Sequence, residues 1–153
     1  MIIFMNNQTK KLLIQNFGEK GTDHWIETFH AKPKNYKRNT YYRIDGAGNG
    51  YAGVGNGLYL GRDENAIKSF YDCENEGLPV LTYMGSPKWL NLFNYYKFKK
   101  FKNDLLSKGI SIINSDQIAI IVRDMGFDGI RYYDPFATGE EFVLFNTSTV
   151  KKI

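Results

Sequence analysis

Two adjacent carboxylates, Glu140 and Glu141, stand at the start of a segment that otherwise reads as a buried β-strand, Phe142-Val143-Leu144-Phe145. Glutamate is depleted in strands, and its charge is costly to bury unless another group partners it. One of the two glutamates is therefore the leading candidate for a catalytic carboxylate. Neighbouring side chains of a strand face opposite sides, so the two are alternatives.

Two further features could belong to a ligand site. Arg43 lies in Thr40-Tyr41-Tyr42-Arg43-Ile44, a segment typical of a β-strand, where an unpaired buried guanidinium would be expensive. Between Asp45 and Gly57 there are six glycines, which free the backbone for positive φ and for close approach by a ligand. Neither a dinucleotide-binding motif nor a P-loop motif accompanies them, so the run is a phosphate-binding loop or an ordinary surface loop.

Length and composition are those of one domain: 153 residues, 42% hydrophobic and 24% charged, which excludes a disordered or membrane-embedded chain. No apolar run reaches the roughly 18 to 20 residues of a membrane span. The segment Met1–Met5 lacks the preceding basic region of a signal peptide. We therefore expect a soluble, cytoplasmic protein with no membrane partner.

The net charge of +4 permits an acidic partner without requiring one. Cys73 is the single cysteine, which excludes an intrachain disulfide framework and a cysteine-based zinc cluster. As a nucleophile it would have only His24 and His30 as potential bases. No cluster of ligand-type residues predicts a metal site.

The remaining elements follow from periodicity and turn residues, and they predict a mixed α+β domain. Pro79 favours an edge position for its strand, and Asp63 is the expected N-cap of the first helix. Short helices are expected in the first thirty residues. The predicted strands are Thr40–Ile44, Leu58–Leu60, Leu78–Met84, Gly129–Tyr133 and Glu141–Phe145, and the predicted helices are Arg62–Tyr71, Lys88–Lys108 and Ser115–Met125, the last ending at Gly126.

The predicted helix Lys88–Lys108 admits two interpretations. Its lysines alternate with aromatic residues, so a basic and aromatic face could hold a nucleic-acid strand by phosphate contact and stacking. Its apolar residues also recur at spacings of three and four, which is typical of an amphipathic helix with solvated lysines, and this interpretation is favoured. The residues concerned are Trp89, Phe93, Tyr95, Tyr96, Lys97, Phe98, Lys99, Lys100, Phe101 and Lys102.

The order of these segments resembles the ADP-ribosyltransferase superfamily over about Thr40–Val150. A Tyr-Tyr-Arg strand is followed by Gly-Asn-Gly-Leu-Tyr-Leu, an Ala-Ile-Lys-Ser-Phe-Tyr helix, Gly-Phe-Asp-Gly-Ile and Glu-Glu-Phe-Val-Leu-Phe-Asn. The most specific parts, Gly57–Leu60 and Glu141–Asn146, are similar to the tyrosine and glutamate strands of the diphtheria-toxin and poly-ADP-ribose-polymerase branch. Residues 1–39 lie outside the match, as a helical extension of a single domain that spans residues 1–153.

The resemblance implies a split β-sandwich with surrounding helices that holds NAD+ as co-substrate, without a metal. Glu141 would be the catalytic glutamate, which bonds the nicotinamide ribose and supports the oxocarbenium-like centre as nicotinamide leaves. Tyr59 would pack against nicotinamide, with Tyr71 or Phe70 completing an aromatic sandwich. Arg43 would hold ribose or diphosphate oxygens.

Arg43, Tyr59 and Glu141 thus form the expected catalytic triad. The residues expected to bind NAD+ are Arg43, Ile44, Gly57, Tyr59, Phe70 and Tyr71. His30 competes with Arg43 for the first-strand position. Ile44 after Arg43 departs from the His-Gly pair of one branch, and Gly139 departs from the Glu-x-Glu signature of arginine-modifying members, which disfavours arginine as the acceptor.

The resemblance therefore implies an NAD+-dependent ADP-ribosyltransferase that cleaves the nicotinamide glycosidic bond and transfers ADP-ribose to an unknown acceptor, which is a protein, a nucleic acid or a small molecule. The chain is also similar to the RES-domain toxins, so an NAD+ glycohydrolase or phosphorylase is an alternative. A non-enzymatic module that binds a nucleotide or an ADP-ribose-like group is another. The family often serves as toxins, which the resemblance implies and the residues do not.

Overall fold

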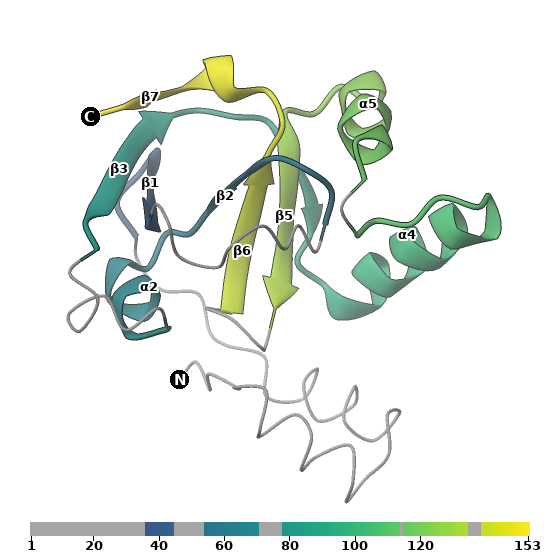
Figure 1. The fold of residues 1–153 in the computed structure, drawn as a ribbon, viewed down its shortest axis with the longest axis horizontal. Helices are drawn as coiled ribbons and strands as arrows, with labels where there is room; N and C mark the ends of the chain where they lie inside the picture. Colours follow the sequence, from purple (N-terminus) through teal and green to yellow (C-terminus); the bar gives the residue numbers. More distant parts are fainter. Residues whose placement is uncertain (1–35, 45–53, 71–77, 114, 135–138) are drawn as a thin grey trace, which may run out of the picture.

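The protein is described here by a computed structural model, which describes residues 36–44, 54–70, 78–113, 115–134 and 139–153. Within them the chain forms two β-sheets and three α-helices, so the predicted mixed α+β class is confirmed (Figure 1). The elements in chain order are β1 (Thr40–Ile44), β2 (Leu58–Leu60), α2 (Glu64–Phe70), β3 (Val80–Gly85), β4 (Trp89–Leu92), α4 (Tyr95–Ser107), α5 (Gln117–Asp124), β5 (Gly129–Asp134), β6 (Gly139–Leu144) and β7 (Val150–Lys152).

The first sheet has the strand order β1-β3-β7 and the second has the order β2-β6-β5-β4. Their strand pairs are antiparallel apart from β4 and β5, which run parallel. A parallel pair needs a crossover connection, and α4 and α5 lie between these two strands in the chain. A single bridge between Tyr42 and Gly61 brings the edge strands β1 and β2 together.

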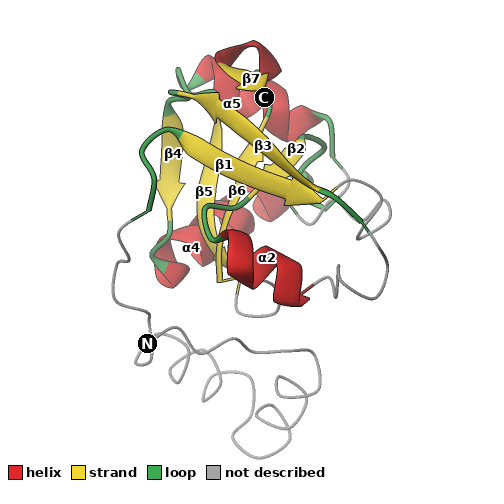
Figure 2. Cartoon of the chain, turned by 90° about the vertical axis from the view of Figure 1, so that its left-hand side faces the viewer, coloured by secondary structure: helices red, strands yellow, loops and turns green. Residues whose placement is uncertain are grey.

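The two sheets pack against each other through apolar side chains. Tyr41, Leu60, Phe142 and Leu144 form a buried cluster with contributions from both sheets. Figure 2 looks onto the sheet that contains β1 and β3, with the four-stranded sheet behind it and α2 beside β1.

The two outer layers are helical. Side chains of α4 and α5 pack against the face of the four-stranded sheet that points away from the other sheet. Ile118 and Val122 of α5 and Ile130 and Val143 of the sheet are fully buried in this layer. Ile67 of α2 packs with Tyr42 and Ile44 of β1. The four-stranded sheet therefore has one face toward the other sheet and one toward α4 and α5.

The predicted helix Lys88–Lys108 is wrong in its first part. Trp89–Leu92 forms β4, and α4 begins only at Tyr95. The side chain of Asn94 caps the helix by accepting hydrogen bonds from the backbone N–H groups of Tyr96 and Lys97, both at 3.1 Å. Pairing with β5 decides the conformation of Trp89–Leu92, and periodicity within the segment does not reveal that pairing.

Smaller differences concern strand ends and positions: β5 continues to Asp134, and β6 runs from Gly139 to Leu144 and not from Glu141 to Phe145. The predicted bounds of β1 and β2 are confirmed, and the carboxylate of Asp63 accepts from the backbone N–H of Ala66 at 3.0 Å, so Asp63 caps α2 as predicted. Pro79 precedes β3 and does not mark an edge, because β3 is the central strand of its sheet. Strand β7 was not predicted.

Within the described ranges, none of the helices has the length and apolar character that crossing a membrane requires.

Candidate functional site

Glu140 and Glu141 lie side by side on β6 and take part in different contacts. In the register of β6 with β5, Glu140 faces Tyr133 and Glu141 faces Tyr132. Side chains alternate along a strand, so the two carboxylates project from opposite faces of the sheet. Glu140 shares its face with Phe142, which packs between the sheets, and Glu141 shares the helix-covered face with Val143.

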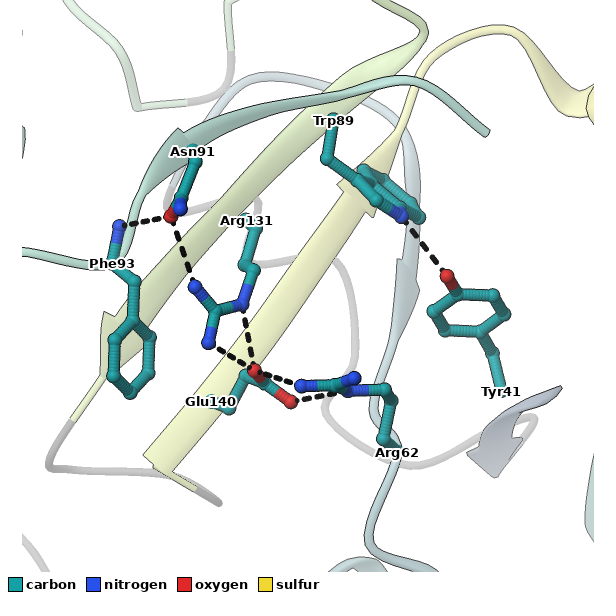
Figure 3. A network of polar contacts seen from close by, with 7 residues as sticks. All are labelled: Tyr41, Arg62, Trp89, Asn91, Phe93, Arg131 and Glu140. Carbon is teal, nitrogen blue, oxygen red and sulfur yellow. Dashed lines mark hydrogen bonds and ion pairs between the residues drawn. The ribbon is translucent and has the colours of Figure 1, made fainter. Parts of the chain in front are cut away.

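Glu140 is held by two arginines (Figure 3). Arg62 donates from Nε to Oε1 at 2.7 Å and from Nη2 to Oε2 at 2.6 Å, a bidentate pair. Arg131 donates from Nε to Oε2 at 2.7 Å, and its Nη1 donates to Oδ1 of Asn91 at 3.0 Å. The side chain of Glu140 is only 9% exposed. We call Glu140, Arg62, Arg131 and Asn91 the Glu140 network.

Aromatic rings flank both guanidinium groups. Arg62 lies over the rings of Tyr36 and Phe142, at 4.8 and 5.4 Å from their centroids, and Arg131 lies over the ring of Phe93 at 4.1 Å. Burial acts to lower the pKa of Arg62, but the hydrogen bond and charge of Glu140 outweigh it and raise that pKa. The negative charge of Glu140 is thus compensated by two guanidinium groups, and both of its oxygens accept hydrogen bonds. This arrangement suits a residue that holds strands together better than one that acts in catalysis.

Glu141 has a different environment. Its Oε2 accepts a hydrogen bond of 2.6 Å from the hydroxyl of Tyr132, the residue directly opposite on β5. Tyr132 is only 4% exposed, and its ring stacks on Phe98 of α4 with centroids 5.4 Å apart and planes 14° apart. Glu141 as a whole residue is half-buried. The hydroxyl of the buried and stacked Tyr132 therefore fixes the position of one oxygen of the Glu141 carboxylate.

Tyr59 lies on the same sheet face as Glu141. It pairs with Val143, two residues beyond Glu141 on β6, so Tyr59 and Glu141 are diagonal neighbours. Its hydroxyl donates to the carbonyl of Gly55 at 2.6 Å and accepts from the backbone N–H of Val54 at 2.9 Å. The Tyr59 hydroxyl thus holds the segment before β2 in place, and any contact of Tyr59 with a ligand would be made by its aromatic ring.

Arg43 connects β1 to the same neighbourhood. Its Nη1 donates to the backbone carbonyl of Tyr59 at 3.2 Å. The structure therefore brings together the strands of the three residues expected to form the triad, β1, β2 and β6, through the contact of Arg43 with Tyr59 and the pairing of β2 with β6. The guanidinium of Arg43 thus contacts the backbone of Tyr59, whereas the hydroxyl of Tyr59 bonds the segment before β2 and the carboxylate of Glu141 bonds Tyr132.

The other expected ligand residues lie in varied positions. Ile44 is 3% exposed and packs against α2, so only its backbone could meet a ligand. A Cβ on Gly57 would lie 2.8 Å from the Leu144 carbonyl oxygen, so close approach of β2 and β6 requires glycine there. Phe70 ends α2, and its side chain lies outside the described atoms. Tyr71 and the competing candidate His30 also lie outside the described residues.

Sequence reasoning missed Arg62, Tyr132 and the ion pair of Arg131 with Glu140. Arg62 lies 78 residues before Glu140, and no local pattern links them. The signal that could have found Tyr132 is the pairing of β5 with β6 as neighbouring antiparallel strands, because Tyr132 lies opposite Glu141 in that register.

Two residues of the motif-like segments have a structural role. Asp128 accepts from the backbone N–H of Lys88 at 2.7 Å and from Nδ2 of Asn146 at 3.1 Å. Its carbonyl also accepts from the backbone N–H groups of Phe145 and Asn146. Asp128 and Asn146 therefore join the start of β5 to the chain before β4 and after β6.

The lysine-rich surface of α4 fits the favoured amphipathic interpretation. Lys100 pairs with Asp104 one turn later at 3.3 Å, and Lys99 lies over the ring of Tyr95 at 5.8 Å. The indole Nε1 of Trp89 donates to the Tyr41 hydroxyl between the sheets (Figure 3). Phe98 and Phe101 pack against the core of the four-stranded sheet. Trp89, Phe98 and Phe101 therefore make packing contacts within the protein, as an amphipathic segment requires.

Comparisons with models of protein families, with curated proteins and with solved structures found no match. Among the described residues there is also no group of three or more histidine, cysteine, aspartate or glutamate side chains that could hold a metal ion. The choice of a function therefore depends on the residues and geometry given above.

Proposed function

We propose that this protein is an NAD+-dependent ADP-ribosyltransferase with a split β-sandwich, which cleaves the nicotinamide glycosidic bond and transfers ADP-ribose to an acceptor. One observation carries the proposal: Tyr59 and Glu141 are diagonal neighbours on one sheet face, and Arg43 bonds the carbonyl of Tyr59. The strands that the family resemblance assigns to the site are thus neighbours in space, although Arg43 and Glu141 are almost a hundred residues apart in the sequence.

Each residue has a role that its chemistry can fill. When nicotinamide leaves, the electrons of the glycosidic bond go to its ring nitrogen and positive charge develops on the ribose, which a carboxylate at Glu141 stabilises. The ring of Tyr59 offers an apolar face to nicotinamide. Arg43 supplies a guanidinium for ribose or diphosphate oxygens. Water or a nucleophile of the acceptor then attacks the ribose carbon.

The contacts of the two glutamates favour Glu141 for this role. The charge of Glu140 is compensated by two guanidinium groups at 2.6 to 2.7 Å, which weakens any field it could exert on a substrate. Glu141 lies on the same sheet face as Tyr59, and its Oε2 accepts a hydrogen bond from the Tyr132 hydroxyl of β5. The family resemblance and the face shared with Tyr59 therefore both favour Glu141.

The test is release of nicotinamide from NAD+ by the wild type, Glu141→Gln and Glu140→Gln, with folding checked by circular dichroism. We expect Glu141→Gln to lower the rate by at least about a hundredfold, the usual cost of losing one electrostatic stabiliser. Folded Glu140→Gln should keep most of the activity. The reverse pattern would move the site to the other sheet face. If the wild type binds NAD+ without releasing nicotinamide, the protein is a binding module and not an enzyme.

A second measurement separates transfer from hydrolysis. Free ADP-ribose formed in stoichiometric amounts with nicotinamide indicates that water is the acceptor, as in a glycohydrolase. Incorporation of labelled ADP-ribose into protein or nucleic acid from a cell extract indicates transferase activity. The same Glu141→Gln variant is the control for both, because the two reactions share the bond-breaking step.

A further inference from the structure

The pair of Tyr132 and Glu141 has a geometry that the proposed triad does not explain. The O–H···O distance of 2.6 Å lies in the range typical of a charge-assisted hydrogen bond to a carboxylate. The donor belongs to the strand adjacent to β6, directly opposite Glu141. None of the segments that carry the family resemblance includes Tyr132.

The donor is rigid. Tyr132 is 4% exposed, and its ring stacks on Phe98, a residue of α4 that packs with the core of the four-stranded sheet. A buried aromatic ring held on its face by another ring has little freedom to reorient. Its hydroxyl is therefore a fixed point against which the Glu141 carboxylate can be oriented.

We propose that Tyr132 is a positioning residue for Glu141: its hydroxyl fixes the rotamer of the catalytic carboxylate through Oε2 and directs the carboxylate toward the nicotinamide ribose. This inference rests on the proposed function. Tyr132 acts through Glu141 and need not touch the substrate. Since a carboxylate has lone pairs on both oxygens, the bond to Tyr132 is compatible with a second bond to a ribose hydroxyl.

A positioning role predicts a particular kinetic signature. Misplacing a catalytic group by a fraction of an ångström slows the chemical step, whereas the affinity for the substrate depends mainly on other contacts. Tyr132→Phe keeps the ring and its stacking on Phe98 and removes only the hydroxyl. We expect kcat to fall on the order of tenfold, with KM for NAD+ changed by less than about twofold.

The experiment is a double-mutant cycle on nicotinamide release, with Tyr132→Phe, Glu141→Gln and the combined variant. If Tyr132 acts through Glu141, Tyr132→Phe lowers kcat in the wild type and has no further effect in the Glu141→Gln background. The matched control is Tyr133→Phe, the adjacent tyrosine, whose ring is 5% exposed and contacts Phe93 on the other sheet face. It should leave kcat unchanged.

The outcomes separate this inference from the function on which it rests. A wild type that releases no nicotinamide overturns both. If the wild type is active, two results overturn the inference alone. In one, Tyr132→Phe has the same kcat as the wild type. In the other, the losses of kcat from Tyr132→Phe and Glu141→Gln add in full in the combined variant. Thermal unfolding of each variant identifies any loss of folded protein, and rates are compared per folded molecule. If Tyr132→Phe does not fold, Phe98→Leu, which removes the stacked ring but keeps the hydroxyl, should give a smaller drop in kcat with KM unchanged.

Discussion

Glu140 and Glu141 are consecutive residues of β6, but Glu140 is bonded by Arg62 and Arg131 on one sheet face and Glu141 by Tyr132 on the other. The alternation of side chains along a strand makes this separation unavoidable. A shift of the β6 register by one residue would exchange their environments. The network around Glu140 and the hydrogen bond to Glu141 therefore both favour the same register.

The Glu140 network predicts a stability cost for Glu140→Gln. The change removes the charge that two partly buried guanidinium groups bond, and the amide can accept on only one of its two polar atoms. Because Arg62 and Arg131 are 32% and 24% exposed, water compensates in part, and we expect a loss of about 1 to 3 kcal/mol. Urea unfolding at neutral pH measures it.

The matched control for that variant is Glu64→Gln. Glu64 pairs with Lys68 one helical turn later at 3.4 Å, with both side chains more than 40% exposed. An exposed pair of this kind contributes about 0.5 kcal/mol or less. Equal losses in the two variants would contradict a stabilising role for the Glu140 network.

Local sequence determined much of the fold. Strands β1 and β2 were predicted with the observed bounds, because Thr40–Ile44 is rich in β-branched and aromatic residues and Leu58–Leu60 is an apolar segment that follows a glycine-rich run. The helix α2 was predicted from the cap at Asp63. The start of α4 and the strand β4 were not predicted, because Trp89–Leu92 is extended through its pairing with β5, which is distant in the sequence.

The candidate site was harder to predict from the sequence for the same reason as β4, because its contacts join residues that are distant in the sequence. Alternation predicted that Glu140 and Glu141 face opposite sides, but it could not say which side meets the helices. That depends on how β6 packs, and the partners that distinguish the two glutamates come from β5 and from the segment after β2. The positive φ of 88° at Gly139 is a left-handed backbone conformation, which gives a conformational reason for glycine at the first residue of β6.

Tyr36 predicts a pH dependence of stability. Burial raises its pKa above the ordinary value of 10.0, the charges of Asp63 and Glu140 add to the shift, and Arg62 and Arg131 oppose it. The folded protein thus keeps the phenol proton where the unfolded chain loses it. The contribution to the free energy of unfolding is fully present below the unfolded pKa and is lost as pH rises through the folded pKa.

We therefore expect the stability difference between the wild type and Tyr36→Phe to shrink as the pH rises above the ordinary tyrosine pKa of 10.0. Urea unfolding of both proteins at several pH values measures it. Tyr96→Phe is the control, since Tyr96 is 51% exposed and lies on α4, away from the Glu140 network. A difference that grows with pH for Tyr36→Phe would contradict the expected sign.

Gly57 provides a test that separates a packing role from ligand contact. A Cβ at this position would lie 2.8 Å from both the Leu144 carbonyl oxygen and Cγ2 of Val143, closer than folded proteins allow. Gly57→Ala must therefore push β2 away from β6, at a cost of about 1 to 3 kcal/mol in the free energy of unfolding. Because Tyr59 lies on β2, nicotinamide release should fall as well.

The control for Gly57→Ala is Gly109→Ala. Gly109 has a φ of 77° and no atom within 4 Å of an added Cβ, so alanine there costs only conformational strain, about 1 kcal/mol, and should leave nicotinamide release unchanged. If Gly57→Ala instead unfolds like the wild type but has a raised KM for NAD+, the glycine serves ligand contact and not strand packing. A loss of both stability and kcat with KM unchanged would show that the distance between β2 and β6 determines how Tyr59 and Glu141 act together.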